Sequence, residues 1–236
     1  MRVLKFALVI LTVFSLICST TTFAAKKKKK KSICGATSAQ RDGDCPSEGC
    51  GGDPELNKRK NLLTPASSPE VYTRSDFVKL KFPASWSSGN KRKLLKDWGE
   101  GTPVVYEAFL MRVKNYPDGQ ESCNCNLKED ENNDWHLVTI ARKTDAEDDS
   151  ITGEVTPRFR PDGWTLSKVR KIAKDKMLIQ LTGYLMLDTQ HLGGGPPVRV
   201  TDWEIHPVTK FKVCTGTVAS CKAGDNWQDL ADFPEP

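Results

Sequence analysis

The sequence lacks several features that would assign it to a well-known class of protein. It contains no G-x-S-x-G, H-E-x-x-H or phosphate-binding P-loop motif, which argues against the serine hydrolases, zinc peptidases and nucleotide-binding proteins that those motifs define. Histidine is scarce, with three residues in the chain. The apolar run FALVILTVFSLIC (6–18) is shorter than the roughly 20 residues of a membrane-spanning helix, so we do not expect it to remain in a bilayer.

Positive charge is also scarce in the main part of the chain. The formal net charge is +5, but Arg2, Lys5 and six consecutive lysines all precede residue 32, so residues 32–236 carry a formal charge of −3. A protein that binds nucleic acid without sequence preference needs a cationic surface to displace counterions from phosphates. Residues 90–96 and 158–176 are locally basic, but the net negative charge of residues 32–236 makes nucleic acid a disfavoured partner.

The first 25 residues predict export. Arg2 and Lys5 precede the apolar run, and the small residues of TTTFAA (20–25) follow it. This order is typical of a secretory signal peptide, which we place at 1–25, and predicts a secreted or periplasmic protein with no membrane span in the mature chain. A lipoprotein is disfavoured because the bulky Leu16 and Ile17 precede Cys18. The lysine tract at 26–31 should be disordered, since its like charges repel one another.

Cysteine is abundant, and its number is informative. Seven of the eight cysteines follow the predicted signal peptide, as expected in an oxidising compartment where disulfides persist. Cys214 and Cys221 flank a short turn and are the favoured pair, whereas the pairing of the others stays open: Cys34, Cys45, Cys50, Cys123 and Cys125. Because seven is odd, at least one thiol lies outside an intrachain disulfide. The closely spaced Cys123 and Cys125 are expected to bond to the amino-terminal segment rather than to hold a metal, since no partner pair at zinc spacing is present.

The chain divides by composition into an arm, a barrel and a tail. Residues 32–100 are rich in turn-forming residues and predict a loop-rich, disulfide-tethered arm with short helices. One of these helices is expected at 54–61, with Asp53 as its cap and Pro54 at its first position. Residues 101–214 form the predicted barrel domain, and 215–236 form a disulfide turn with an acidic tail.

The barrel is predicted from five extended segments and one helix. Strands are expected at 102–116, 135–143, 151–157, 177–188 and 198–213, and the apolar spacing in 163–176 predicts an amphipathic helix capped by Thr165. Gly183 lies among bulky neighbours, as expected where a strand bends sharply. The order β-β-β-α-β-β is that of the OB-fold, a five-stranded Greek-key barrel. We therefore predict an all-β, OB-like barrel with one helix; a β-sandwich is the alternative.

Several fragments in this part of the chain carry a family resemblance. GTPVVYEAFLMRVK, ESCNC, NDWHLVTIA, GEVTPRFRP, QLTGYLMLD and TDWEIHPVTKFKV occur in this order between 101 and 213. This series, and the ESCNC and WEIHPV pieces in particular, resembles a group of uncharacterised exported bacterial proteins. The upstream GCGGDPELNKRKN resembles a segment that accompanies such domains. The resemblance implies an OB-like barrel but no established activity, so no catalytic residue follows from it.

Strand alternation gives the first candidate site. Since alternate residues of a strand share a face, Glu204 and His206 point to one side of the last strand. His136 and Glu154 occupy similar positions on the second and third strands, and His191 precedes the last strand. Imidazole and carboxylate groups together suit a divalent transition metal, which could activate water to hydrolyse an ester or phosphodiester. Alternatively, these groups lie on a solvated barrel face, with Glu204 paired to a basic residue and His206 stacked on a tryptophan.

Tryptophan gives the second candidate site. OB barrels bind oligosaccharides and oligonucleotides on the face of their second and third strands, where Trp135 could act as a stacking platform with Trp164 nearby. We assign Trp203 to the core. The sequence therefore predicts a binding module for a glycan, a cell-envelope component or a protein. A metal-dependent hydrolase is the alternative, and a single-stranded nucleic-acid binder is the second alternative. No cofactor is required by this prediction unless the metal site forms.

Overall fold

The computed structural model describes residues 34, 45–84, 86, 92–192 and 199–236. The predicted signal peptide (1–25) and lysine tract (26–31) lie outside these residues. The described residues belong to one compact unit, Ser32–Pro236. Within them, no helix combines the length and the apolar character that crossing a bilayer would require.

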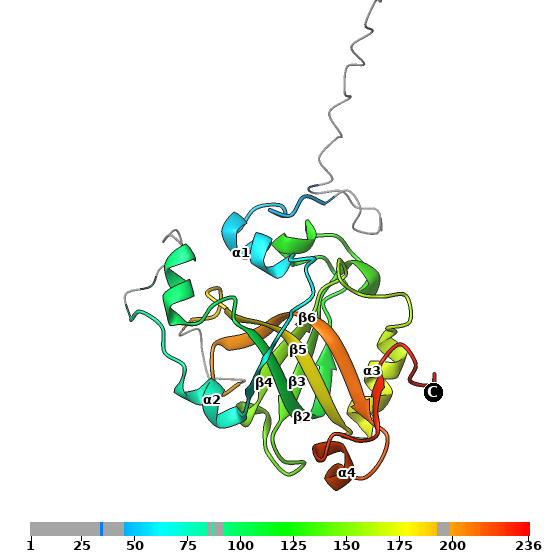
Figure 1. Ribbon diagram of the computed structural model, residues 1–236. Coiled ribbons are helices and arrows are strands. Elements are labelled where there is room, and N and C mark those ends of the chain that lie inside the picture. The colour runs from blue at the N-terminus through cyan, green and yellow to red at the C-terminus, as the bar shows by residue number, and fades with distance from the viewer. Residues whose placement is uncertain (1–33, 35–44, 85, 87–91, 193–198) are drawn as a thin grey trace, which may run out of the picture. The chain divides into compact units, whose positions relative to one another are not determined.

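A closed five-stranded barrel forms the centre of this unit (Figure 1). Its strands are β2 (Pro103–Lys114), β3 (Trp135–Ile140), β4 (Ile151–Val155), β5 (Leu178–Leu187) and β6 (Trp203–Cys214). They are hydrogen-bonded in the order β2-β3-β4-β6-β5, and β5 pairs back with β2, which closes the barrel. All these pairings are antiparallel except that of β4 with β6. The predicted strands and the predicted barrel are therefore confirmed.

The predicted helix between the third and fourth barrel strands is α3 (Leu166–Lys174). The Thr165 hydroxyl accepts a hydrogen bond from the Lys168 backbone N–H, as expected of a capping residue. Val169, Ile172 and Ala173 are buried on one side of the helix and pack into the main core. The apolar spacing of the sequence therefore predicts both the helix and the face that it buries.

The chain contains more helix than the sequence predicts, so it is mixed α/β rather than all-β with one helix. The helix predicted at 54–61 is α1 (Pro54–Lys60), with Asp53 as its cap and Pro54 in its first turn. The further helices are α2 (Arg74–Lys79) and α4 (Val218–Lys222), with 3₁₀ helices η2 (Arg92–Trp98), η3 (Ser122–Asn124), η4 (Asp130–Asn132) and η5 (Glu147–Asp149). Two short strands also extend the sheet: β1 (Glu70–Tyr72) pairs with β2, and β7 (Trp227–Asp229) pairs with β6. Elements this short have too few residues to show a periodic pattern, which is why most of them were not predicted.

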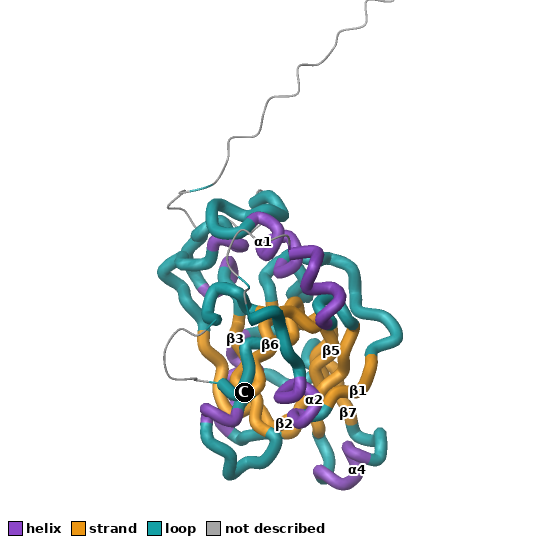
Figure 2. The backbone as a smooth tube through the Cα atoms, turned by 90° about the vertical axis from the view of Figure 1, so that its left-hand side faces the viewer, coloured by secondary structure: helices purple, strands orange, loops and turns teal. Residues whose placement is uncertain are grey.

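The barrel interior and the surrounding segments share one hydrophobic core. Strand residues such as Leu137, Leu181 and Ile205 are completely buried in it, and Trp203 lies there as predicted. Phe77 of α2 joins the same core from outside the barrel. Each such side chain contributes roughly 1.5–3 kcal/mol through burial, so the segment before the barrel takes part in the same packing. Figure 2 shows α1 near one end of the strands and α4 near the other.

Gly183 marks a sharp irregularity in β5, as expected. The register with β6 shifts on both sides of Gly183, where it pairs with Val208. A Cβ atom at position 183 would lie 2.4 Å from the Pro207 carbonyl oxygen, which is closer than van der Waals contact allows. A glycine is therefore needed for the close approach of the two backbones at this bulge.

The disulfides connect the arm to the barrel and close the tail. They are Cys34–Cys50, Cys45–Cys125 and Cys214–Cys221. The last confirms the favoured pair, and the second confirms that Cys125 bonds to the amino-terminal segment. Cys123, which was expected to do the same, is instead a buried free thiol. It is the odd cysteine that the sequence required.

Candidate functional site

The pairing of β3, β4 and β6 brings the predicted polar residues together. His136 of β3 lies opposite Glu154 of β4 in the antiparallel register. Gly153 of β4 lies opposite Ile205 of β6, so Glu154 is next to the strand positions that carry Glu204 and His206. These side chains point away from the barrel interior, because their strand neighbours Leu137, Val155 and Ile205 occupy the core.

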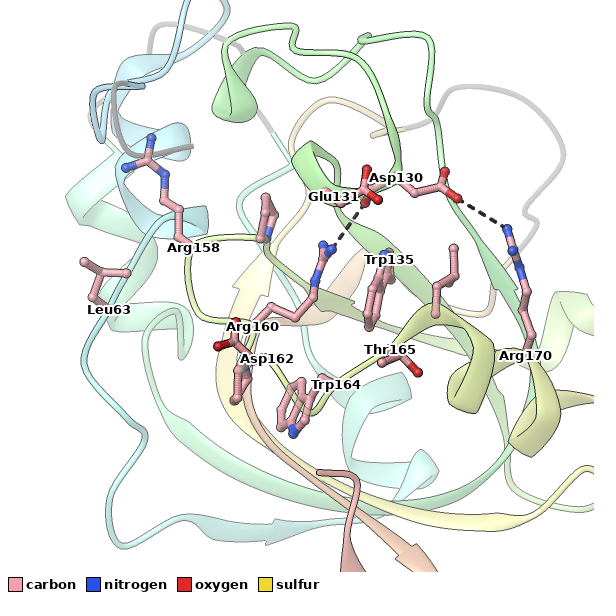
Figure 3. A pocket seen from close by; sticks show the side chains of 13 residues that line it. Leu63, Asp130, Glu131, Trp135, Arg158, Arg160, Asp162, Trp164, Thr165 and Arg170 are labelled. Atoms are coloured by element: carbon pink, nitrogen blue, oxygen red, sulfur yellow. Dashed lines mark hydrogen bonds and ion pairs between the residues drawn. The ribbon is translucent and has the colours of Figure 1, made fainter. Parts of the chain in front are cut away.

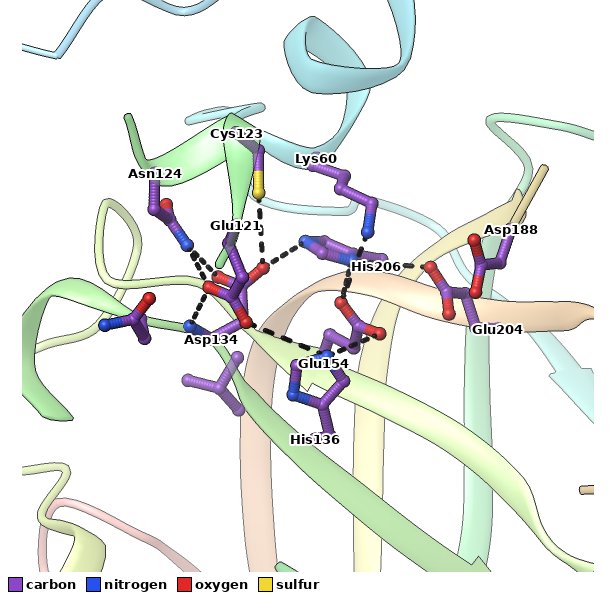
Figure 4. Close-up of polar contacts among 12 residues, drawn as sticks. Lys60, Glu121, Cys123, Asn124, Asp134, His136, Glu154, Asp188, Glu204 and His206 are labelled. Carbon is purple, nitrogen blue, oxygen red and sulfur yellow. Dashed lines mark hydrogen bonds and ion pairs between the residues drawn. The ribbon is translucent and has the colours of Figure 1, made fainter. Parts of the chain in front are cut away.

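Glu154 is the centre of the resulting cluster (Figure 4). Its Oε2 atom lies 2.7 Å from His206 Nδ1, and its Oε1 atom lies 3.2 Å from His136 Nε2. His206 Nδ1 is also 3.5 Å from Glu204 Oε1. The four residues that the sequence proposes as metal ligands in the barrel strands therefore meet.

His191, the fifth proposed ligand, contacts Asp188 instead. The distance from His191 Nδ1 to Asp188 Oδ2 is 2.6 Å, and the side chain is largely exposed. Arg199 then connects Asp188 with the cluster, at 2.5 Å from Asp188 Oδ2 and 3.1 Å from Glu204 Oε2. His191 is therefore joined to the cluster only through this ion-pair chain.

The expectation of a solvated face is wrong at this place. The side chains of Glu154, Glu204 and His206 are 3%, 0% and 0% exposed. Residues from α1 and from the 115–134 loop cover them: Lys60 Nζ lies 3.7 Å from Glu154 Oε2, and the Asn61 amide donates to the Cys123 carbonyl. The strands alone would leave these groups in water, but the arm is packed over them.

Of the partners expected for Glu204 and His206, the first is present and the second is not. Glu204 pairs with a basic residue, Arg199, as expected. His206 contacts carboxylates rather than a tryptophan ring. The imidazole that does contact an aromatic ring is His136, which meets Tyr116 edge to face with the ring centroids 5.0 Å apart.

The structure adds residues to the site that the sequence does not single out as ligands. Asp134 shares a strand face with His136, which is the signal that could have found it, and its Oδ2 atom lies 3.5 Å from His206 Nε2. Cys123 Sγ lies 3.7 Å from the same oxygen. Glu121 accepts a hydrogen bond from the Asp134 backbone N–H at 2.8 Å. Lys60 shows no sequence signal beyond a basic residue in the last turn of a helix.

Burial and mutual attraction set the protonation of this cluster. Burial disfavours a charged His206, but the charge of Glu154 and hydrogen bonding to the carboxylates raise its pKa to about 10. Burial also opposes ionisation of Glu154, yet the nearby His136, Lys60 and His206 hold its pKa well below the usual range. Burial, followed by the charge of Asp134, raises the pKa of Glu121 to about 8. Burial raises the pKa of the Cys123 thiol well above its usual value.

Several buried atoms of the cluster have no hydrogen-bond partner among the described residues. They are Glu154 Oε2, Glu204 Oε1, Glu121 Oε1 and both ring nitrogens of His206. Buried polar atoms in native proteins are nearly always satisfied. Ligand atoms of Asp134, Glu154 and His206 all lie within 4.8 Å of one another, and the same holds for Glu121, Cys123 and Asp134. His206 Nδ1 and Glu154 Oε2 nevertheless form an ion pair at 2.7 Å, whereas the nearest charged partners of His206 Nε2, Glu204 Oε1 and Glu121 Oε1 lie at 3.5–3.9 Å.

The donor atoms suit a divalent transition metal. Carboxylate oxygen and imidazole nitrogen are ligands that zinc, iron and manganese accept. His206 would bind a metal through Nε2 after losing its proton, because its Nδ1 atom already lies 2.7 Å from Glu154 Oε2. Lys60 opposes this, because its ammonium group already lies 3.7 Å from Glu154 Oε2. Lys60 therefore supplies part of the positive charge that the carboxylates require.

A separate pocket of about 640 Å³ lies beside the cluster, between the 115–134 loop and the β4–α3 connection (Figure 3). Trp135 and Trp164 line it, as do the guanidinium groups of Arg158, Arg160 and Arg170. The two tryptophans are 3% and 5% exposed and belong to the hydrophobic core. The guanidinium carbon of Arg160 lies 3.7 Å from the Trp135 ring centroid. The predicted ligand-binding tryptophans thus share one pocket, but they form its base rather than open stacking platforms.

Comparison with known proteins identifies no relative. No family model matches the chain, and no match was found among curated proteins or among solved structures. The resemblance to exported bacterial proteins therefore stays a prediction, and function must be argued from the site.

Proposed function

We propose that this protein is an exported OB-fold protein that acts as a metal-dependent hydrolase of esters or phosphodiesters. The order of the barrel strands, with α3 between the third and fourth of them, is the order expected of an OB-fold. The outer side of β3 and β4 is the face on which OB barrels hold their ligands. The buried polar cluster occupies this face.

A single observation carries the proposal. Ligand atoms of Asp134, Glu154 and His206 come from three strands or strand ends, lie within 4.8 Å of one another, and include buried atoms with no hydrogen-bond partner among the described residues. Burying carboxylates is costly unless they are paired or hold a cation. Clusters of this kind are also characteristic of functional sites.

The chain's own residues have separable roles in this proposal. Asp134, Glu154 and His206 would hold the metal, which when bound lowers the pKa of water and polarises the scissile bond. Glu204 is paired with Arg199 and lies 3.5 Å from His206 Nδ1, so it helps to orient that imidazole. His136 lies 3.2 Å from Glu154 Oε1 and is 21% exposed, so it can carry a proton between the cluster and a substrate at the surface.

The test is metal content, measured on protein purified from an oxidising compartment without chelator. We expect stoichiometric zinc, manganese or iron by mass spectrometry in the wild-type chain, and loss of that metal in His206→Ala. His191→Ala is the matched control and should keep the metal, because His191 contacts Asp188 rather than the cluster. Wild-type protein that stays metal-free after incubation with each ion would overturn the proposal.

A binding module is the second candidate, and the pocket beside the cluster favours it. Its tryptophan base and the guanidinium groups of its three arginines suit an acidic glycan of the cell envelope, since guanidinium groups bind carboxylates well, although Asp130, Glu131 and Asp162 line the same pocket. We expect oligogalacturonate, used as the probe in calorimetry, to bind the wild-type chain and to bind Arg170→Ala at least fivefold more weakly. His206→Ala should bind it normally. No binding of this probe, or equal binding by Arg170→Ala, would count against the pocket.

A further inference from the structure

We infer that Glu121, Cys123 and Asp134 form a second metal position, for a thiophilic divalent ion such as zinc, which shares the Asp134 carboxylate with the first. The inference rests in part on the proposed function, because both positions use Asp134. It adds a sulfur ligand, a second ion and a different metal preference to that site.

The thiol of Cys123 is the first observation. It is the free cysteine of the described residues, whereas the neighbouring Cys125 is bonded to Cys45. The side chain is buried, with Sγ directed to Asp134 Oδ2 at 3.7 Å. An exported protein that bonds its other described cysteines in pairs has kept this one as a thiol beside two carboxylates.

The orientation of the two carboxylates is the second observation (Figure 4). The Asn124 amide donates to Glu121 Oε2 at 2.7 Å and to Asp134 Oδ1 at 3.1 Å. Of the remaining oxygens, Asp134 Oδ2 lies 3.7 Å from Cys123 Sγ and Glu121 Oε1 lies 3.9 Å from His136 Nε2. One ligand atom of each of Glu121, Cys123 and Asp134 lies within 4.8 Å of the others. Metal ligands are commonly oriented in this way, by outer hydrogen bonds that hold one atom and leave the other for the ion.

His206 is the third observation, and it concerns the Asp134 carboxylate that the two positions share. Its Nε2 atom is completely buried, has no hydrogen-bond partner among the described residues, and lies 3.5 Å from Asp134 Oδ2. An imidazole nitrogen and a thiol sulfur therefore approach the same carboxylate oxygen. Bond lengths of about 2.0–2.3 Å to a tetrahedral zinc place neighbouring ligand atoms roughly 3.4–3.7 Å apart. The two measured separations agree with this spacing.

The donor set selects the class of ion. Sulfur with carboxylate oxygen suits zinc or cobalt, whereas calcium and magnesium need more oxygen ligands and do not take thiols. On binding, the Cys123 thiol and the Glu121 carboxyl each release a proton to solvent, and the sulfur and a carboxylate oxygen form bonds to the metal. No oxidant or reductant is required.

The experiment is a cobalt titration of the metal-free chain with its disulfides intact. Thiolate bound to Co²⁺ gives a near-ultraviolet charge-transfer band that carboxylate and imidazole ligands do not. We expect this band in the wild-type chain and two equivalents of Co²⁺ bound. Cys123→Ser should lose the band and one equivalent, while Asp134→Asn should lose the band and bind both ions more weakly. Asp130→Asn, a carboxylate of the same loop, is the matched control and should change neither.

The possible results separate this inference from the proposed function. One equivalent of Co²⁺ without the band would overturn the sulfur site and leave the Asp134–Glu154–His206 site standing. The band with a single equivalent that His206→Ala does not change would support the sulfur site and overturn the other. A band that persists in Cys123→Ser would overturn the inference, and no binding at all would overturn both. The wild-type band needs no variant, so the test does not depend on whether Cys123→Ser folds.

Discussion

Lys60 is the residue on which the charge balance of the buried cluster depends most. It is the last residue of α1, its side chain is 10% exposed, and its ammonium lies 3.7 Å from Glu154 Oε2. Burial opposes its charge, but the carboxylates of Glu154 and Glu204 raise its pKa well above the usual range. Removing one partner of such a pair leaves the other charge buried and uncompensated.

We therefore expect Lys60→Met to lower the free energy of unfolding by about 3–5 kcal/mol in metal-free buffer. The same variant should bind zinc or cobalt at least tenfold more tightly, because a buried cation beside Glu154 no longer repels the ion. Urea denaturation and metal titration measure the two effects. Lys58→Met is the matched control on the same helix; its exposed pairs with Glu55 and Glu48 are screened by solvent and should contribute little to stability. Unchanged metal affinity in Lys60→Met would contradict a metal at Glu154.

Asp188 gives a prediction for the dependence of stability on pH. Burial opposes its ionisation, but His191, Lys60 and Arg199 hold its pKa below the usual range. Its pKa in the folded chain is thus lower than the value of about 3.9 in an unfolded chain. Ionised Asp188 therefore contributes stability above that unfolded value, and the contribution is lost as the pH falls toward the folded value.

We expect the free energy of unfolding of the wild-type chain to fall more steeply between about pH 5 and pH 2 than that of Asp188→Asn. Urea denaturation at successive pH values measures the slope. Asp188→Asn should also be less stable at pH 7, because Arg199 loses a partner at 2.5 Å. Asp225→Asn, an exposed carboxylate in the tail, should keep the wild-type slope. Equal slopes for the wild type and Asp188→Asn would show that Asp188 does not control acid stability.

At the scale of elements, α1 packs over β6. Hydrogen bonds and a disulfide hold it there. Asp53 caps its first turn, and Asn61 at its end donates to the Cys123 carbonyl. The Cys45–Cys125 bond joins the arm to the loop that carries Glu121 and Cys123. These hydrogen bonds and the disulfide hold Lys60 in the cluster.

Loss of the Cys45–Cys125 bond should therefore destabilise the chain strongly. The bond joins residues 80 apart, for which the chain-entropy relation gives about 4–5 kcal/mol, whereas the separation of 7 for Cys214–Cys221 gives about 2 kcal/mol. We expect Cys45→Ala/Cys125→Ala to lose more stability in urea than the control Cys214→Ala/Cys221→Ala. Amide hydrogen exchange in α1 should also accelerate in the first variant alone. The opposite order of stabilities would mean that the arm is held mainly by noncovalent packing.

The elements that the sequence predicted are those with a long periodic pattern. β2, β5, β6 and α3 each repeat their apolar residues often enough to reveal both type and buried face. β1 and β7 have three residues each and exist because β2 and β6 offer an edge to pair with. They form through tertiary pairing, which a local sequence pattern cannot predict.

The candidate site was likewise predictable from the sequence only in part. Strand alternation predicted which way His136, Glu154, Glu204 and His206 point, because alternation can be recognised in each strand separately. The predicted barrel then brought their three strands together. It could not show that this face is buried, since the cover comes from α1 and from the 115–134 loop. Lys60 and Cys123 reach the cluster through the packing of segments that are distant in sequence, and only the odd number of cysteines hinted at the second of them.

At the scale of the whole molecule, the cluster joins the arm, the 115–134 loop and the barrel strands. Lys60 comes from the arm, Cys123 from a loop, Glu154 and His206 from barrel strands, and Arg199 from the segment before β6. A cation bound here would contact several of these parts at once, and none of them would hold it after unfolding. Binding should therefore stabilise the unit against global unfolding rather than locally.

We expect zinc at 100 times its dissociation constant to raise the free energy of unfolding by about 2.7 kcal/mol for each occupied position. Chelator should reverse the effect, and Glu154→Gln should abolish it at the first position, as measured by urea denaturation. Calcium at the same concentration is the control and should stabilise far less, because imidazole and thiol are poor ligands for a hard cation. Equal stabilisation by calcium would mean that exposed carboxylates bind both ions without selection. A zinc-specific effect that survives Glu154→Gln and is lost in Cys123→Ser would place the ion at the sulfur position alone.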